Sequence, residues 1–498
     1  MMDDHGKSDR LVLPAKPPNK PAVVAGAEVV GGRGLPEGNT AGEVRPGRSA
    51  GQGVSSDLDR VRQVARKDRD VRFTALLHHV TVDRLREAYR AIRPDAAPGV
   101  DGVTWRDYGL DLEANLRDLH ARVHRGAYRA RPTRRVFIPK PDGRVRPLGV
   151  AALEDKVLQR AVVEVLNAIC EEDFLGFSYG FRPGRSQHDA LDALAVGITR
   201  RKVNFVLDAD ISDFFTGLDQ SWLVKFLEHR IADKRVLRLI QKWLTAGVIE
   251  DGEWSSTESG TAQGASVSPL LSNVFLHYVF DLWADQWRRR NARGDVILVR
   301  FADDYVAGFQ HREDAERFLA DLRGRFAEFG LELHPEKTRL IEFGRFAAQN
   351  RAQRGLRKPE TFDFLGLTHI CGEDRHGRFK LKRVTSKKKM RAKLHAVKAE
   401  LRRRMHHPIP EQGRWLARVL QGHYNYYAVP DNSEALRGFR ERVIRYWRHA
   451  LSRRSQKDEI TWERTRRLSA RWLPEPRVLH PWPNVRFDAR TQGRSPVR

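Results

Sequence analysis

Apolar residues recur along the chain at two spacings, and the two spacings together predict a protein of mixed helices and strands. Intervals of three and four positions, as at Val82, Leu85 and Tyr89, indicate helices, whereas short apolar runs bounded by turn residues indicate strands. The expected helices lie at 153–170, 222–227, 236–244, 268–287 and 313–329. The expected strands lie at 135–139, 205–211, 296–301 and 305–309.

Residue types at the borders of these elements refine the picture. Ser268 is the expected N-cap of the helix at 268–287, and Pro269 is its expected first-turn proline, because both residue types are favoured there. Residues 1–55 are rich in Gly, Pro, Ala and Ser and show no periodicity. That composition predicts a disordered tail.

Two β-hairpins are expected to carry charged side chains at their tips. The first joins a strand at 135–139, through Pro141-Asp142-Gly143, to a second strand that runs into Leu148, and it places Lys140, Arg144 and Arg146 around its turn. The second joins the strands at 296–301 and 305–309 through Asp303-Asp304. One tip is therefore basic and the other is acidic.

Charge is distributed unevenly along the 498 residues. The net charge is +26 and the isoelectric point is near 10.4, which favours a polyanionic partner such as nucleic acid. Residues 380–498 carry 31 basic and 10 acidic side chains, whereas residues 203–345 carry 18 basic and 23 acidic ones. An acidic middle followed by a basic end is expected of a metal-binding catalytic centre beside a nucleic-acid surface. The alternative is a solvated, arginine-rich helical surface.

Composition also excludes several classes of protein. Two cysteines, Cys170 and Cys371, are too few for a disulfide framework or a Cys₄ zinc module. No run of 18 apolar residues is present, and the N-terminus lacks the apolar core of a signal peptide. We therefore expect a cytoplasmic protein of about three domains with no membrane association.

Carboxylates beside apolar strands indicate a metal site. Adjacent Asp303 and Asp304 repel each other and lose hydration unless a cation compensates them. The strand that ends in Asp208-Ala209-Asp210 supplies a further carboxylate. Such a set suits two Mg²⁺ ions in phosphoryl transfer. The alternative is that the Asp pair only caps a hairpin, because Asp favours turns.

Eight segments between Arg146 and Tyr427 resemble, in the same order, the motifs of bacterial group II intron-encoded reverse transcriptases, also called maturases. Phe301-Ala302-Asp303-Asp304 resembles the Tyr-X-Asp-Asp hairpin of that family. Ala262 replaces the usual proline of its Pro-Gln-Gly motif, and Phe301 replaces its tyrosine, without removing a catalytic group. The other matching segments lie at 146–149, 180–186, 210–215, 260–273, 334–338, 362–366 and 422–427.

The resemblance implies an α+β fold of the right-hand polymerase type, with an antiparallel-sheet palm and a helical thumb. The implied division is a tail at 1–55, an N-terminal extension and fingers at 56–200, a palm at 201–380, a thumb or maturase domain at 381–480, and a short tail at 481–498. An HNH endonuclease with cysteine pairs, which many relatives carry, is not expected here.

The resemblance also assigns the metal ligands. The family's first ligand stands five residues before an aromatic residue, which selects Asp210, paired with Phe215, over Asp208. Asp210, Asp303, Asp304 and the Ile211 carbonyl would hold two Mg²⁺ ions, with Mn²⁺ as a possible substitute. Phe215 would pack beneath the sugar and exclude a 2′-hydroxyl, although it could also be an ordinary core residue.

Further roles follow from the matching positions. Lys140 and Arg146 would contact the incoming triphosphate, Gln263 and Gly264 would line the nucleotide pocket, and Lys337 would protonate pyrophosphate as a general acid. Lys140 and Arg146 could instead lie at a solvated hairpin tip. Gln263 and Gly264 could belong to an ordinary loop, and Lys337 could be a surface lysine.

The basic C-terminal region suggests RNA binding, because cations alternate with aromatic residues that can stack on bases. The aromatic residues could instead form the core of the helical thumb. The candidate RNA-binding residues are Arg182, Lys387, Lys388, Tyr424, Tyr426, Arg453 and Arg454.

The resemblance implies that the protein is an RNA-directed DNA polymerase that also binds its group II intron RNA and assists splicing and retrohoming. Its partners would be that RNA, an RNA template with a DNA primer, deoxynucleoside triphosphates, target DNA and possibly a second copy of itself. Three alternatives stay open. They are a reverse transcriptase used in defence or diversification, an RNA-binding splicing cofactor without polymerase activity, and an RNA-dependent RNA polymerase, which Phe215 disfavours.

Overall fold

The computed structural model describes residues 52–139, 145–250, 252–256, 260–261, 263–454 and 460–491. Residues 1–51 of the expected tail lie outside these ranges. Residues 52–55 belong to helix α1 (Gln52–Lys67), so the expected disorder is wrong for them. Lys140 and the expected turn at 141–143 also lie outside the described residues.

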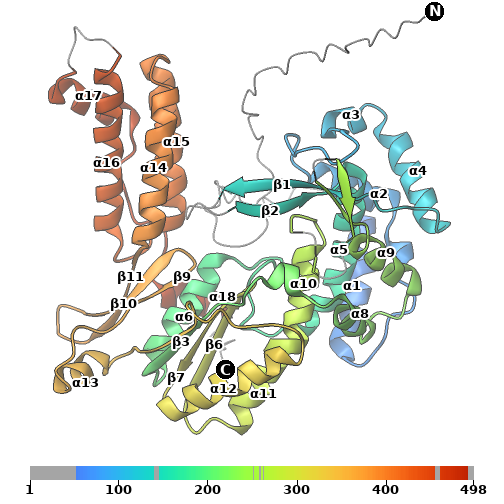
Figure 1. Ribbon diagram of the computed structural model, residues 1–498, viewed down its shortest axis with the longest axis horizontal. Coiled ribbons are helices and arrows are strands. Elements are labelled where there is room, and N and C mark those ends of the chain that lie inside the picture. Colours follow the sequence, from blue (N-terminus) through green and yellow to red (C-terminus); the bar gives the residue numbers. More distant parts are fainter. Residues whose placement is uncertain are drawn as a thin grey trace, which may run out of the picture.

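Helix α5 (Leu153–Asp173) is the centre of the first helical layer, as the apolar pattern at 153–170 predicts. It contacts α1, α2 (Val82–Arg90) and α10 (Ser268–Leu276), and its apolar face is buried. The predicted helices at 222–227 and 236–244 are confirmed and lie on the same side of the molecule (Figure 1). These two predicted helices are α8 (Gln220–Glu228) and α9 (Lys234–Leu244), and the same part also contains α3 (Trp105–Gly109) and α4 (Leu112–His124).

The predicted basic hairpin forms part of a four-stranded sheet of order β2-β1-β4-β5. Strand β1 (Thr133–Pro139) pairs antiparallel with β2 (Val145–Val150), which places Ile138 opposite Arg146. Strands β4 (Val248–Glu250) and β5 (Glu253–Ser255) were not predicted, and β4 pairs parallel with the start of β1. A segment far along the chain therefore extends this hairpin.

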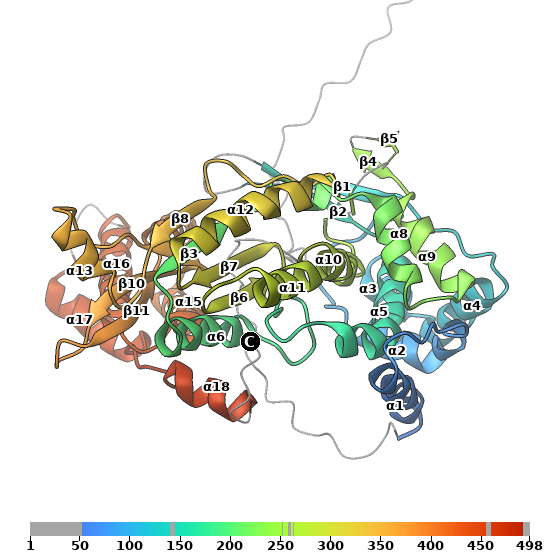
Figure 2. The ribbon, with the colours of Figure 1, turned by 90° about the horizontal axis from the view of Figure 1, so that it is seen from below.

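A second sheet, of order β6-β7-β3-β8, carries the acidic hairpin, and all of its pairings are antiparallel. One face, including Leu207 and Ala307, packs against α12, whereas the alternate residues Val206 and Val306 pack against α6. Figure 2 shows α12 and α6 on opposite sides of these strands. The elements are α6 (Gln187–Arg200), β3 (Phe205–Ala209), β6 (Val296–Phe301), β7 (Asp304–Phe309), α12 (Arg312–Ala327) and β8 (Arg339–Glu342).

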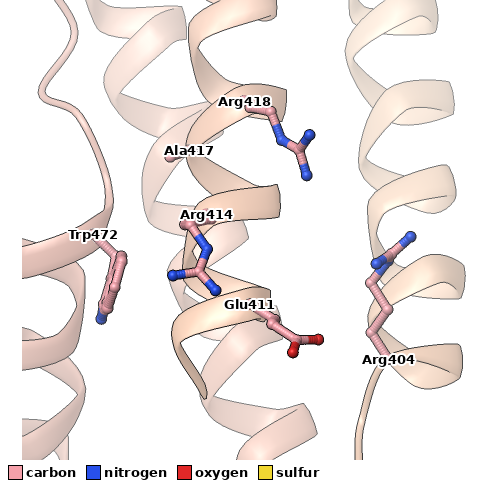
Figure 3. Close-up of a pocket in the computed structure, with 6 residues that line it drawn as sticks. All are labelled: Arg404, Glu411, Arg414, Ala417, Arg418 and Trp472. Atoms are coloured by element: carbon pink, nitrogen blue, oxygen red, sulfur yellow. The ribbon is translucent and has the colours of Figure 1, made fainter. Parts of the chain in front are cut away.

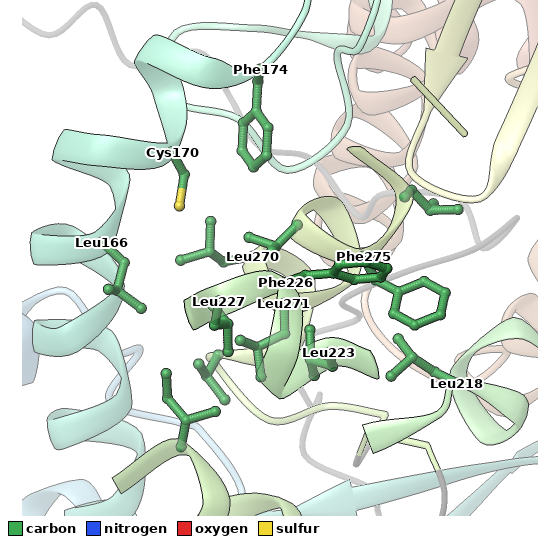
Figure 4. Close-up of a cluster of buried hydrophobic side chains, with 14 of the residues drawn as sticks. Leu166, Cys170, Phe174, Leu218, Leu223, Phe226, Leu227, Leu270, Leu271 and Phe275 are labelled. Carbon is green, nitrogen blue, oxygen red and sulfur yellow. The ribbon is translucent and has the colours of Figure 1, made fainter. Parts of the chain in front are cut away.

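The predicted helix at 268–287 exists as a continuous helical segment with an irregular middle. Helix α10 leads into a π-helical turn, His277–Asp281, which continues as α11 (Leu282–Arg290). Pro269 lies in the first turn as expected, but the N-cap is Val267 rather than Ser268. The π-turn widens the helix locally, and such turns are frequent at functional sites. Figure 4 shows the α10 side chains packed against α5 and α8.

The C-terminal part begins with a three-stranded sheet of order β11-β10-β9 and continues as helices. Helices α14, α15 and α16 pack around a second apolar core that includes Leu416, Phe439 and Trp447 (Figure 1). Helix α18, which lies in the expected tail at 481–498, contacts α6. The elements are β9 (Phe362–Phe364), β10 (Leu367–Glu373), β11 (Phe379–Thr385), α13 (Ala347–Gln353), α14 (Lys387–Arg403), α15 (Ile409–Tyr427), α16 (Ser433–Ser452), α17 (Trp462–Trp472) and α18 (Pro483–Thr491).

Among the described helices, none combines the length and the apolar character that crossing a membrane requires.

Candidate active site

Strand register brings the predicted carboxylates to one edge of the β6-β7-β3-β8 sheet. Ala209 pairs with Tyr305 at the end of β3, and Phe301 pairs with Asp304 across the hairpin. The residue after Ala209 therefore lies beside Asp304. Asp210, Asp303 and Asp304 come from two neighbouring strands and the turn between β6 and β7, as the sequence predicts.

The turn of the acidic hairpin is tight and strained. Ala302 has a φ of +57°, a left-handed conformation that costs a residue with a side chain about 1–2 kcal/mol. Gly180 lies against this turn so closely that a Cβ there would be 2.2 Å from the Ala302 nitrogen. A glycine is therefore required at 180 for the 177–181 segment to support the turn.

A buried ion pair fixes the hairpin from inside. The Arg300 guanidinium meets the Asp281 carboxylate at 2.5 and 2.7 Å, and both side chains are at most 1% exposed. Arg300 Nη1 also donates to the Ala302 carbonyl at 2.9 Å and to Asn273 Oδ1 at 3.0 Å. Asn273 Nδ2 donates to the Gly180 carbonyl at 2.7 Å. The π-turn supplies Asp281, so the helical segment 268–290 holds the Ala302-Asp303 turn in place.

Sequence reasoning missed this network. Its only sequence signal is an arginine inside the apolar run Val296–Phe301, where a charged side chain needs a buried partner.

Asp210 lies at the edge with a cation already beside it. Its carboxylate accepts a hydrogen bond from Lys337 Nζ at 2.6 Å, and Asp210 is only 8% exposed. The segment before Lys337 runs alongside, because the His334 amide donates to the Asp210 carbonyl at 2.8 Å. Lys337 therefore meets the predicted metal ligand, although the two residues are 127 positions apart.

The neighbouring residues distinguish Asp208 from Asp210. Asp208 lies opposite Arg339 in the β3–β8 pairing, and its carboxylate is 3.6 Å from Arg339 Nη2. The bridge between Ile211 and Leu333 uses the Asp210 carbonyl and the Ser212 amide, so it does not use the Ile211 carbonyl. Asp208 therefore lies near Arg339 of β8, whereas the Asp210 carboxylate pairs with Lys337.

The carboxylates also affect the tyrosine that follows them. Burial, together with the negative charges of Asp210 and Asp208, raises the pKa of Tyr305 well above its usual value. Tyr305 therefore stays neutral and adds no charge to the edge.

The donor set fits a hard divalent cation. Carboxylate oxygens are the ligands that Mg²⁺ and Mn²⁺ prefer, and the Lys337 ammonium at 2.6 Å shows that the Asp210 carboxylate is directed at a cation. Within the described residues, no three His, Cys, Asp or Glu side chains form a preassembled metal cluster. The chemistry of the donors, rather than a finished cage, supports the metal assignment.

The predicted nucleotide-pocket loop packs against Phe215. The Thr261 amide donates to the Phe215 carbonyl at 2.9 Å, and a Cβ on Gly260 would be 2.5 Å from the same oxygen. Phe215 is 8% exposed and belongs to the main core, where it packs edge-on against Phe214. It is therefore a core residue whose backbone carbonyl contacts the loop.

The same loop meets the basic hairpin on its other side. The Gly149 amide of β2 donates to the Gln263 carbonyl at 2.7 Å. Gly264 has a φ of +112°, and a Cβ there would be 2.8 Å from the Gly149 carbonyl. The close contact brings Gln263 and Gly264 to the strand that carries Arg146.

Two predicted RNA-binding side chains, Arg182 and Tyr424, are buried, which corrects those predictions, and a third, Tyr426, is half-buried. The Arg182 guanidinium is buried, pairs with Glu171 at 2.9 Å and donates to the carbonyls of Leu175 and Ser178 at 2.8 Å. Tyr424 is 2% exposed, and Tyr426 donates its hydroxyl to the Leu365 carbonyl at 2.6 Å. Cation–aromatic alternation in the sequence does not distinguish a core from a binding surface.

The other predicted RNA-binding residues lie at the ends of the C-terminal helices. Lys387 and Lys388 are exposed in the first turn of α14, which has no acidic residue there. Cations at that end oppose the helix dipole. Arg453 is exposed, whereas Arg454 is half-buried and donates to the carbonyls of His406 and His407 at 3.3 and 3.1 Å.

The chain resembles known proteins over the region that holds this site. A family model described as "Reverse transcriptase (RNA-dependent DNA polymerase)" matches residues 138–369. The chain is 33% identical over 273 residues to Protein YkfC of Escherichia coli (strain K12), which covers 49% of this chain and 72% of that protein.

Two further relatives carry intron names. Identity is 31% over 222 residues to the group II intron-encoded protein LtrA of Lactococcus lactis subsp. cremoris, covering 44% of this chain and 37% of that protein. It is 29% over 306 residues to the putative COX1/OXI3 intron 1 protein of Saccharomyces cerevisiae, covering 52% and 36%. The chain thus spans little more than a third of each of these two relatives.

Proposed function

Because the chain belongs to the group II intron-encoded reverse transcriptases, which are RNA-directed DNA polymerases, we propose that it extends a DNA primer along an RNA template at the edge formed by Asp210, Asp303 and Asp304. The observation that carries this proposal is the strand register, because it sets Asp210 beside the Asp303-Asp304 turn. The β6-β7-β3-β8 sheet would then be the palm, the β2-β1-β4-β5 sheet and helices α2–α5 would belong to the fingers, and α14–α17 would form the thumb.

The metal ligands in this proposal are Asp210, Asp303 and Asp304, with the Ile211 carbonyl in support. Two Mg²⁺ ions, or Mn²⁺ in their place, would activate the primer 3′-hydroxyl and neutralise the triphosphate. Arg300 and Asp281 would fix the turn, so that Asp303 needs no rearrangement to reach its working position.

Lys337 has two tasks in this proposal. Its ammonium neutralises the Asp210 carboxylate before substrate arrives, since the two groups are 2.6 Å apart. It then serves as the proton donor to the leaving pyrophosphate, because a protonated amine near the phosphates can supply a proton as charge develops on the leaving oxygen.

Nucleotide selection would rest on the loop at 260–264 and its neighbours. Arg146, together with Lys140, would contact the triphosphate, and Gln263 and Gly264 would bring backbone close to the nucleotide. Phe215 would exclude a 2′-hydroxyl sterically and so favour deoxynucleotides.

We also propose that the protein binds its group II intron RNA, assists splicing and acts at a DNA target in retrohoming. The basic C-terminal helices support this proposal, as does the likeness to a group II intron-encoded protein. Exposed cations, including Lys387, Lys388 and Arg453, would contact phosphates.

Primer extension on an RNA template with Mg²⁺ tests the proposed function. The comparison sets deoxynucleotides against ribonucleotides, and wild type against Asp303→Ala. Extension with deoxynucleotides only, lost in the variant, is expected. A folded wild-type protein that binds structured RNA but extends no primer would instead identify a splicing cofactor. Equal use of ribonucleotides would remove the role given to Phe215.

A further inference from the structure

A hollow of about 530 Å³ lies among the C-terminal helices. Its lining comes from the residue after α14, from α15 and from the last residue of α17 (Figure 3). The site described above does not include it. The residues that line it are Arg404, Glu411, Arg414, Ala417, Arg418 and Trp472.

The charges around the hollow are mostly positive and partly uncompensated. Arg414 and Arg418 are exposed and lie one turn apart on α15, a spacing at which like charges repel. In the part of the chain that the structure describes, neither forms an ion pair or a hydrogen bond. Glu411, the acidic residue of the lining, is 3.4 Å from His407 Nδ1 instead. An anion in the hollow would relieve the repulsion between the two arginines.

Two other arginines of these helices are ion-paired. Arg467 pairs with Glu463 at 3.0 Å, one turn away on the same helix. Arg404, at the rim of the hollow, is half-buried and pairs with Glu400 at 2.7 Å. Among the three arginines that line the hollow, Arg414 and Arg418 are therefore the two without an ion pair to any described residue.

An aromatic ring is held close to Arg414. Trp472 lies over Gly413 so closely that a Cβ at that position would be 2.6 Å from the indole Cγ. The Arg414 guanidinium is 6.0 Å from the ring centroid, and that of Arg471 is 5.4 Å from it. A held, half-buried indole among cations is suited to stacking on a nucleobase.

We propose that the hollow binds one unpaired nucleotide of a structured RNA, with its base on Trp472 and its flanking phosphates on Arg414 and Arg418. Phosphate explains the two unpaired guanidiniums, and a base explains the aromatic wall. The inference rests on the proposed RNA-binding function. It adds a contact that is separate from the polymerase edge, because none of the residues that line the hollow belongs to the β6-β7-β3-β8 sheet.

The test measures binding of the full-length chain to a stem–loop RNA that carries 2-aminopurine in its loop. Removing two phosphate contacts with Arg414→Ala/Arg418→Ala should lower the slope of log affinity against log salt by about 1.4 to 1.8. Trp472→Ala should weaken binding by about 5- to 150-fold and leave the 2-aminopurine unquenched, as expected when one stacked base is lost.

A matched control is Arg442→Ala/Arg445→Ala, which removes two exposed charges from the neighbouring helix α16, outside the lining of the hollow. An equal loss of salt dependence in this control would overturn the proposal, since binding would then be diffuse. Trp472→Ala also removes packing on Gly413, so its binding result is interpreted only if its melting temperature equals that of the wild type. If the melting temperature changes, the Arg414→Ala/Arg418→Ala variant alone decides.

A further probe tests the need for an unpaired nucleotide. A fully paired RNA duplex should bind without the loss caused by the arginine variant. If the duplex shows the same loss, the assignment to an unpaired nucleotide is wrong. Primer extension by the wild-type chain is measured separately, so that failure of the polymerase proposal and failure of this site are distinguishable.

Discussion

The buried ion pair between Arg300 and Asp281 predicts that loss of its carboxylate lowers both the stability of the protein and its primer-extension activity. Asp281→Ala would leave the Arg300 guanidinium without its carboxylate in a place where both side chains are at most 1% exposed. Loss of one partner of such a pair costs about 3–5 kcal/mol, because an uncompensated charge stays buried. Total stabilities of domains are about 5–15 kcal/mol, so this is a large fraction.

The assay combines urea unfolding with single-turnover primer extension. Glu316→Ala is the matched control, because it breaks the Arg312–Glu316 ion pair, whose side chains are 61% and 52% exposed. The control should lower the free energy of unfolding by no more than about 1 kcal/mol. If Asp281→Ala lowers it by no more than Glu316→Ala does, the Arg300–Asp281 pair does not hold the turn as argued.

A double variant separates stability from positioning. Arg300→Met with Asp281→Leu leaves no buried charge, so we expect it to recover much of the stability that Asp281→Ala loses. Primer extension should stay low, because nothing then donates to the Ala302 carbonyl or to Asn273. Wild-type extension by the double variant would refute the positioning role of Arg300.

Four further outcomes are expected. Lys337→Met should slow single-turnover extension by about 10²- to 10⁴-fold, as loss of a general acid does; a rate within a few-fold of wild type would assign Lys337 to charge balance only. Phe215→Ala should raise the use of ribonucleotides relative to deoxynucleotides in competition assays, whereas an unchanged ratio would leave Phe215 as core. Gly180→Ala should reduce extension, because its Cβ would meet the Ala302 nitrogen at 2.2 Å; full activity would show that the turn tolerates displacement. Burial lowers the pKa of His277 to about 4. Between about pH 4 and 6.5 the unfolded chain therefore binds more protons than the folded chain, and the free energy of unfolding should fall as pH falls. His277→Phe should make this fall shallower in urea titrations.

The acidic hairpin could be predicted from the sequence because its information is local. Apolar runs on either side of Asp303-Asp304 specify two strands and a tight turn, and both strands form as expected. The sequence placed Asp304 in the turn, whereas it is the first residue of β7, and the turn itself is Ala302-Asp303.

The parts that could not be predicted depend on contacts between distant segments. Arg300 meets Asp281 only because a π-turn rotates that carboxylate toward β6, and no spacing in the sequence signals this. Arg182 and Tyr424 are the opposite case, in which a local pattern predicts the wrong role. They match a pattern that is typical of RNA binding, yet the fold buries both, because the same residue types also satisfy a core.

The most direct test of the account compares two aspartates of one strand. Asp208 and Asp210 lie two residues apart on β3 and its end. Asp208 is near Arg339, whereas Asp210 pairs with Lys337 and follows Ala209, the β3 residue opposite Tyr305. The rate of single-turnover primer extension, measured over a Mg²⁺ titration, should be at least about 100-fold lower in Asp210→Asn than in wild type. The substitution removes a charge that would stabilise the metal ions by several kcal/mol. The rate should stay within a few-fold of wild type in Asp208→Asn. Equal losses in the two variants, or near-normal extension by Asp210→Asn, would contradict the central claim that this edge is the polymerase centre.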